Sequence, residues 1–91
     1  MSLVWRVEVL AGAKRQLKKL DTPVAARIIR YLEKEVIAKG DPRRVGKALV
    51  GDLSGLWRYR VGDYRILCRI EDDALVVLVV DMGHRGSVYT P

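Results

Sequence analysis

Four arginines between Arg58 and Arg69 are spaced in a way that suits phosphate binding. Gly62-Asp63 is typical of a two-residue hairpin turn, and counting outward from it places Arg60 opposite Arg65. Because side chains alternate between the faces of a strand, the four arginines share one face. Like charges directly opposite each other destabilise a hairpin, whereas guanidinium groups clamp phosphates through paired hydrogen bonds. The pattern therefore favours a polyanionic ligand, most simply a phosphate chain.

The opposite face of the predicted hairpin is apolar. It carries Trp57, Tyr59, Val61, Tyr64, Ile66, Cys68 and Ile70. Cys68 is the one cysteine of the chain, which excludes an internal disulfide and fits a reducing compartment. Its place among apolar residues indicates a core side chain rather than a nucleophile.

A second group of polar residues follows the last apolar run of the chain. His84 and Arg85 come soon after that run, and Tyr89 follows. If the run is a strand antiparallel to its hairpin neighbour, Arg85 ends close to Arg60 and Arg65. Tyrosine can stack on a nucleic-acid base, and histidine can transfer protons near neutrality. Together these residues can grip a phosphate and stabilise charge on it; a solvated basic face without catalysis is the alternative.

The elements that position these residues follow from periodicity. Residues 3–10 alternate as a half-buried strand. A short helix follows, with an apolar stripe at Ala13, Leu17 and Leu20. A second helix begins at Thr22-Pro23, a capping residue followed by proline, and ends at Gly40.

The second half of the chain reads as strands. Residues 45–53 predict an edge strand, in which Lys47 can either reach a phosphate or blunt the edge. The hairpin covers 56–70. Residues 74–82 predict a strand buried on both faces, typical of a central strand. The order β-α-α-β-β-β-β predicts an α+β domain, with two N-terminal helices packed on one face of a small, mainly antiparallel sheet.

Composition fits one domain over residues 1–91, with 49% hydrophobic residues to form its core. The longest apolar run is far too short for a membrane span, and nothing resembles a signal peptide, so we expect a soluble intracellular protein. The net charge of +6 suits a nucleic acid or an acidic protein as partner. Without a P-loop, a CxxC or paired histidines, we expect no metal and no cofactor.

The hairpin and its flanks resemble a known family. Gly46-Lys47 and, further on, Trp57-Arg-Tyr-Arg-Val-Gly-Asp-Tyr-Arg65 resemble the central motif of RelE-type toxins in the RelE/ParE superfamily. The resemblance extends to the N-terminal strand, the helical pair and the closing Gly-His-Arg-Gly-Ser-Val-Tyr. It implies a type II toxin that enters the ribosomal A site and cuts mRNA through attack by the 2′-hydroxyl, without metal.

Roles transfer where positions match the family motif. The resemblance implies that Arg65 stabilises the transition state, that Arg85 protonates or stabilises the leaving oxygen, and that Tyr89 stacks on the substrate base. The predicted catalytic set is Arg60, Arg65, Arg85 and Tyr89, and the predicted RNA-binding set is Lys47, Arg58, Arg69 and His84.

One family position is altered in this chain. Arg58 and Arg60 match two basic positions, often lysines, that hold the RNA and include the proposed general base. Lysine can lose its proton among other cations, whereas arginine practically cannot. We therefore expect Arg60 to act electrostatically, with the proton passing to another group such as His84, or to water.

The resemblance also implies partners. A RelB-like antitoxin is expected to wrap the bare sheet face in a hetero-oligomer, and the ribosome and mRNA are the expected targets in the cytoplasm. Two other functions stay open at this point: a ParE-type poison of DNA gyrase, and an inactive module that acts with its antitoxin in repressing their operon.

Overall fold

The computed structural model describes residues 4–84, and its elements follow the predicted order β-α-α-β-β-β-β. The strands are β1 Arg6–Val9, β2 Lys47–Ala48, β3 Trp57–Val61, β4 Tyr64–Glu71 and β5 Val76–His84. The α-helices are α1 Ala11–Lys18 and α2 Thr22–Tyr31. Three short segments complete the chain: the π-helix η1 Leu32–Ile37 and the 3₁₀ turns η2 Pro42–Arg44 and η3 Gly51–Leu53.

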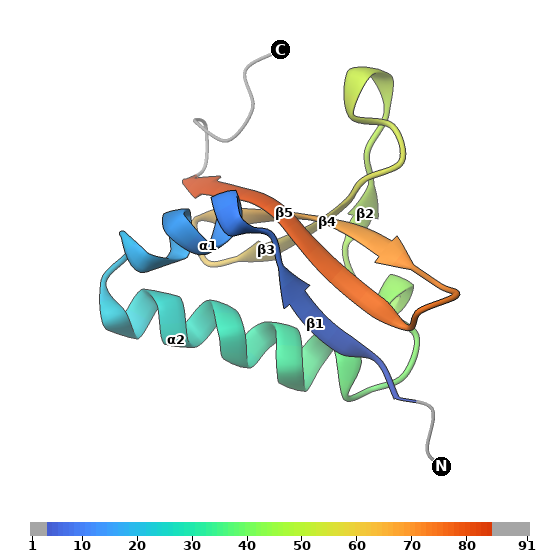
Figure 1. Ribbon diagram of the computed structural model, residues 1–91, viewed down its shortest axis with the longest axis horizontal. Helices are drawn as coiled ribbons and strands as arrows, with labels where there is room; N and C mark the ends of the chain where they lie inside the picture. Colours follow the sequence, from blue (N-terminus) through green and yellow to red (C-terminus); the bar gives the residue numbers. More distant parts are fainter. Residues whose placement is uncertain (1–3, 85–91) are drawn as a thin grey trace.

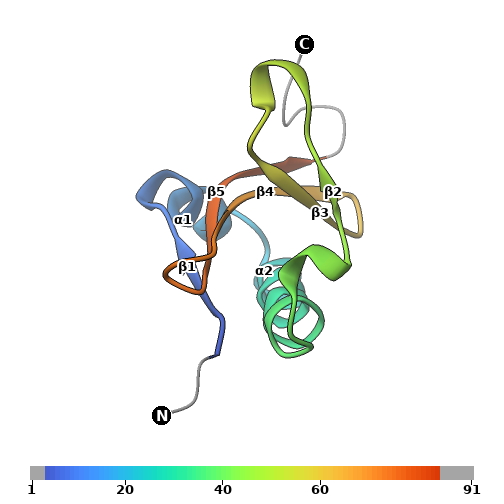
Figure 2. The ribbon, with the colours of Figure 1, turned by 90° about the vertical axis from the view of Figure 1, so that its right-hand side faces the viewer.

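One five-stranded sheet in the order β1-β5-β4-β3-β2 forms the frame of the molecule. The β1–β5 pair is parallel and the other pairs are antiparallel, so the mainly antiparallel α+β sheet is confirmed. Figure 1 shows α2 running beneath the sheet and α1 beside the end of β5. The segment with β2 and η3 rises on the side of the sheet away from α2 (Figures 1 and 2).

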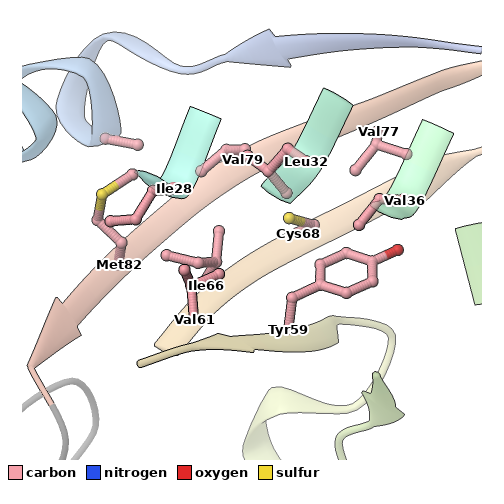
Figure 3. Packing of buried hydrophobic residues seen from close by; sticks show 11 residues of the cluster. Ile28, Leu32, Val36, Tyr59, Val61, Ile66, Cys68, Val77, Val79 and Met82 are labelled. Atoms are coloured by element: carbon pink, nitrogen blue, oxygen red, sulfur yellow. The ribbon is translucent and has the colours of Figure 1, made fainter. Parts of the chain in front are cut away.

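The core lies between α2 with η1 and the inner face of the sheet. Ile28, Leu32 and Val36 repeat at four-residue spacing and are at most 1% exposed. They meet Tyr59 and Val79 from the sheet (Figure 3). The helical stripe and the alternating strand residues thus bury each other, which is the favourable term that holds this small domain together.

The hairpin has the predicted register. Val61 pairs with Tyr64, and Arg60 pairs with Arg65. Gly62 has φ +57°, and Asp63 is not among the residues with positive φ, a combination that belongs to a type II′ turn. Glycine is needed at this position because other L residues are strained at positive φ. The turn therefore fixes two arginines directly opposite each other.

The predicted edge strand 45–53 is wrong in extent. Only Lys47–Ala48 pairs with β3, and Gly51–Leu53 form the 3₁₀ turn η3 instead of strand. Gly46 and Gly51 adopt φ +84° and +68°, and left-handed residues interrupt strand pairing.

Three other boundaries differ from the predictions. Within the described residues the first strand is Arg6–Val9, since Leu10 already caps α1. The second helix changes at Leu32 from α to π before it ends near Gly40, which has φ +97°. The last strand starts at Val76 rather than at residue 74, because the turn before it extends to Leu75 at φ +54°.

β5 is central, as predicted, but only its inner face is fully covered. Val77 and Val79 are 0% exposed, whereas Leu78 on the outer side is half-buried. A bulge at Val80 shifts the pairing with β4, since Cys68 pairs with Val79 while the preceding residue pairs with Asp81. The face of the sheet away from α2 is therefore partly open.

Candidate functional site

The open face of the sheet carries a cluster of cations in two neighbouring rows. In the first row, Lys47 pairs with Arg58 across β2 and β3. In the second, Arg60 pairs with Arg65 across β3 and β4. Paired residues share a face, and the rows are two residues apart along β3, so all four side chains emerge on one side. We call Lys47, Arg58, Arg60 and Arg65 the cationic face.

Two arginines of the cationic face have part of their side chains buried against the protein. The Nε atoms of Arg58 and Arg65 are shielded from solvent, although both residues are partly exposed. Arginine stems commonly cover apolar surface in this way while the guanidinium tip stays wet. We attribute to these stems the burial of Leu67, which is 2% exposed and pairs with Arg58. The guanidinium groups are thereby held close to the sheet surface.

The other predicted RNA-binding residues lie elsewhere. Arg69 is on β4 about 13 Å along the strand from Arg65, and its Nη1 is 3.8 Å from Oε1 of Glu71. His84 pairs with Tyr64, whose row faces the helices, and their rings meet edge to face with centroids 5.4 Å apart. The structure thus brings Lys47 and three arginines together and leaves Arg69 and His84 outside that group.

Two predicted catalytic residues, Arg85 and Tyr89, lie outside the described residues. The strand that leads to them does reach the hairpin turn as expected, because His84 pairs with Tyr64 beside Gly62-Asp63. The predicted proximity of Arg85 to Arg60 stays a prediction.

Sequence reasoning missed one carboxylate on this face. Asp81 pairs with Leu67, which pairs with Arg58, so Asp81 ends the first cationic row. Its Oδ1 accepts a 2.8 Å hydrogen bond from Nε2 of Gln16, and Oε1 of Gln16 accepts from the amide of Met82 at 3.2 Å. Gln16 thus hydrogen-bonds to the part of β5 that lies beyond its pairing with β1, which ends at Val79. A charge interrupting the apolar run 74–82 was the signal in the sequence.

The buried polar groups of the core act as structural anchors. The Tyr59 hydroxyl donates a 2.7 Å hydrogen bond to the Pro42 carbonyl, and burial raises the pKa of this phenol. Burial also raises the pKa of the Cys68 thiol to about 12. Only the thiolate is a nucleophile, so the prediction that Cys68 is a core residue agrees with its buried position.

Across the described residues, no helix is long and apolar enough to cross a membrane.

Comparison with known proteins defines the family. A family model described as the ParE toxin of the type II toxin–antitoxin system parDE matches residues 7–89. Toxin RelG of Mycobacterium tuberculosis is 32% identical over 85 residues, which cover 93% of this chain and 95% of that protein. Toxin RelE of the same organism is also 32% identical over 85 residues, covering 93% of this chain and 86% of that protein. The chain belongs to the RelE/ParE superfamily of type II toxins.

Solved structures agree with this assignment. The toxin–antitoxin complex RelBE2 from M. tuberculosis contains a chain that is 31% identical, superposes with a TM-score of 0.81, and is matched over 100% of its length and 91% of this one. The isolated Escherichia coli RelE toxin is 15% identical with a TM-score of 0.71, covering 91% of this chain and 85% of that one, so it shows the shared fold alone.

Proposed function

We infer that the chain is an endoribonuclease toxin that cuts mRNA on the ribosome. The observation that carries this proposal is the pairing of Arg60 with Arg65 on an open sheet face, beside Arg58 and Lys47. Four cations in two rows can hold a phosphodiester and stabilise the extra negative charge of a pentacoordinate phosphorus. A fold that sets like charges in register gains stability when such an anion binds.

The reaction is an internal transesterification of RNA. The 2′-oxygen forms a bond to the adjacent phosphorus, and the bond from phosphorus to the 5′-oxygen of the next nucleotide breaks. The products are a 2′,3′-cyclic phosphate and a 5′-hydroxyl. Arg65 and Arg60 stabilise the phosphoryl oxygens through charge-assisted hydrogen bonds, and Arg58 and Lys47 hold the flanking strand.

Water takes the proton of the 2′-hydroxyl in this proposal. The guanidinium groups of Arg58, Arg60 and Arg65 stay protonated at any physiological pH, so they cannot act as bases. His84 pairs with Tyr64 on the side of the sheet that faces the helices. The cationic face therefore acts by electrostatic stabilisation, and the leaving 5′-oxygen takes a proton from water. As further parts of the same proposal, we assign stabilisation of that oxygen to Arg85 and stacking on the substrate base to Tyr89.

A RelB-like antitoxin is the proposed partner. Similar toxins have been solved with one, in the RelBE2 complex and in the RelE–RelB complex of Pyrococcus horikoshii. The net charge of +6 and the open cationic face suit an acidic segment that competes with RNA for the same arginines.

Induction of the toxin in cells tests the proposal. We expect primer extension to show cuts within translated codons for the wild type and for Lys18→Gln, which removes one exposed charge from α1. We expect cuts below detection in cells for Arg65→Gln, and weak cleavage for Arg65→Lys, which keeps the charge but loses the paired donors. Full cleavage by folded Arg65→Gln would overturn the proposal.

A ParE-type poison of DNA gyrase is the second candidate, favoured by the match of residues 7–89 to the ParE toxin model. It predicts intact mRNA and a DNA-damage response on induction, with gyrase-dependent double-strand breaks. The same cultures therefore separate the two functions.

A further inference from the structure

A second cationic site lies on the other side of β3, between α2 and the hairpin turn. An open cleft of about 480 Å³ is lined by Arg27, Arg30, Tyr31, Lys34, Glu35, Arg60, Val61 and Gly62. Its apolar floor comes from Val61 and Tyr31, which are buried or half-buried, and its cations come from α2, η1 and β3.

The hairpin turn and the helix meet at one end of the cleft. A Cβ placed on Gly62 would lie 2.9 Å from Nη1 of Arg27, closer than real Cβ contacts come. The absence of a side chain at Gly62 therefore lets this guanidinium pack against the turn, although Arg27 as a whole is exposed. The Arg27 guanidinium therefore lies beside the turn at one end of the cleft.

The helical side of the cleft places like charges together. Arg27 and Arg30 are three residues apart on α2, so they are neighbours on one helix face and repel each other. Lys34 follows in the π-helical η1, where the Ala38 amide bonds to the Glu33 carbonyl at 3.2 Å, five residues back. Short π segments occur frequently at functional sites. The repulsion between these cations lowers the stability of the helix, and an anion bound in the cleft would offset that loss.

The carboxylate in the cleft wall is already neutralised. Oε1 of Glu35 is 2.9 Å from Nζ of Lys39, and this hydrogen bond lowers the pKa of the Glu35 carboxyl. The Glu35 carbonyl also accepts a 2.7 Å hydrogen bond from the Arg44 guanidinium. A ligand in the cleft therefore meets a net positive field from Arg27, Arg30, Lys34 and Arg60.

Arg60 joins the cleft to the cationic face. Arg60 pairs with Arg65, so it belongs to the open sheet face. Among the described residues β2 pairs only with Trp57 and Arg58 of β3, so β3 is an edge strand at Arg60, and this residue also lines the cleft. We propose that the cleft between α2 and the hairpin turn binds the phosphodiester backbone of an RNA strand outside the cleaved nucleotide, forming one cationic track with the open sheet face. A chain of regularly spaced phosphates matches such a track, because a strand leaving Arg65 across Arg60 enters the cleft. This inference rests on the proposed RNA substrate.

Salt-dependent RNA binding tests the proposal. The probe is a fluorescein-labelled, 2′-O-methylated single-stranded 12-nucleotide RNA, which cannot be cut by its own 2′-oxygen. The test variant is Arg30→Gln/Lys34→Gln, and the matched control is Lys14→Gln/Lys18→Gln, which removes two exposed charges from α1. Two lost phosphate contacts reduce the slope of log K against log salt by about 1.4, equivalent to roughly 25-fold weaker binding at 0.1 M salt.

We expect this loss for the cleft variant and an unchanged slope for the control. Neither variant should unfold at a lower temperature than the wild type, since glutamine is a good helix former and the cleft variant loses like-charge repulsion. An unchanged slope in the cleft variant would overturn the proposal. So would a variant that keeps its RNA slope but loses affinity for a 12-residue glutamate peptide, because the cleft would then serve an acidic protein segment.

The same assay keeps this inference apart from the proposed function. If the wild type binds RNA with a steeper salt slope than the cleft variant but never cuts mRNA, then the nuclease proposal fails and the proposal that the cleft binds RNA stands. If the wild type cuts mRNA, and the cleft variant cuts it equally well and binds RNA with the same salt slope, then only the proposal about the cleft fails.

Discussion

Replacement of Arg60 should stabilise the protein while it impairs function. Arg60 is exposed, faces Arg65 directly across the hairpin, and lines a cleft with three other cations. Opposed side chains in an antiparallel pair have Cβ atoms about 4.5–5.5 Å apart, and such pairs change stability by about 0.2–1 kcal/mol. We expect Arg60→Gln to raise the free energy of unfolding by about 0.5 kcal/mol, and Arg60→Glu by about 1 kcal/mol because attraction replaces repulsion.

Urea and thermal unfolding at two salt concentrations measure this gain. For a domain of this size, about 0.5 kcal/mol corresponds to roughly 2–4 °C in Tm and about 1 kcal/mol to roughly 4–8 °C. The gain should appear in 10 mM salt, where the Debye length is about 30 Å, and largely vanish in 1 M salt, where it is about 3 Å. Both variants should cut mRNA more slowly than the wild type.

Arg69→Gln is the matched control for stability. Arg69 lies on the same face of the same hairpin, but it pairs with Leu78 and contacts Glu71 at 3.8 Å, so it faces no cation. It should give no gain at either salt concentration. If Arg60→Gln is no more stable than the wild type in low salt, or if its gain persists in 1 M salt, the repulsion argument is wrong.

Three further outcomes follow from the core and the surface. Tyr59→Phe should lower the free energy of unfolding by about 1–2 kcal/mol in urea titrations without changing cleavage, since it leaves the buried Pro42 carbonyl without its 2.7 Å donor. The hydrogen bond from Arg43 lowers the pKa of the Asp72 carboxyl. The stability from this pair is therefore fully present above the unfolded-state pKa of about 3.9, and it is lost as the pH falls through the lower pKa of the folded state. Asp72→Asn should flatten the acid limb of a stability–pH curve. Cys68 should react with a thiol reagent only after unfolding, because burial raises its pKa to about 12, and rapid labelling of the native protein would contradict this.

The hairpin and the order of elements were predictable because short-range rules determine them. A two-residue Gly-Asp turn sets the register, and alternation then assigns Arg60 and Arg65 to one face without reference to the rest of the chain. The apolar stripe through Ile28 and Leu32 identifies the helical core in the same way. These predictions depend on neighbours close in sequence.

The features that the sequence did not reveal depend on contacts between distant residues. The bulge at Val80 alters the pairing of β4 with β5, and Asp81 reaches the open face only through that pairing. Gln16 is 65 residues from Asp81, so their hydrogen bond leaves no local pattern. The cleft beside Arg27 likewise forms only when α2 packs against the hairpin turn. Arg27, Arg30 and Lys34 therefore line one cleft only in the folded chain.

Single-turnover cleavage on purified ribosomes tests the central claim most directly, that the cationic face stabilises a transferring phosphate. The wild type and Lys18→Gln are expected to yield fragments with a 5′-hydroxyl, which a polynucleotide kinase labels without prior phosphatase treatment, and a 2′,3′-cyclic phosphate on the other side of the cut. Arg65→Gln is expected to lower the cleavage rate by about 10²–10³, the usual effect of removing one donor from a charged transition state. An Arg65→Gln protein that folds normally and cleaves at the wild-type rate, or wild-type fragments that carry a 5′-phosphate, would contradict the account.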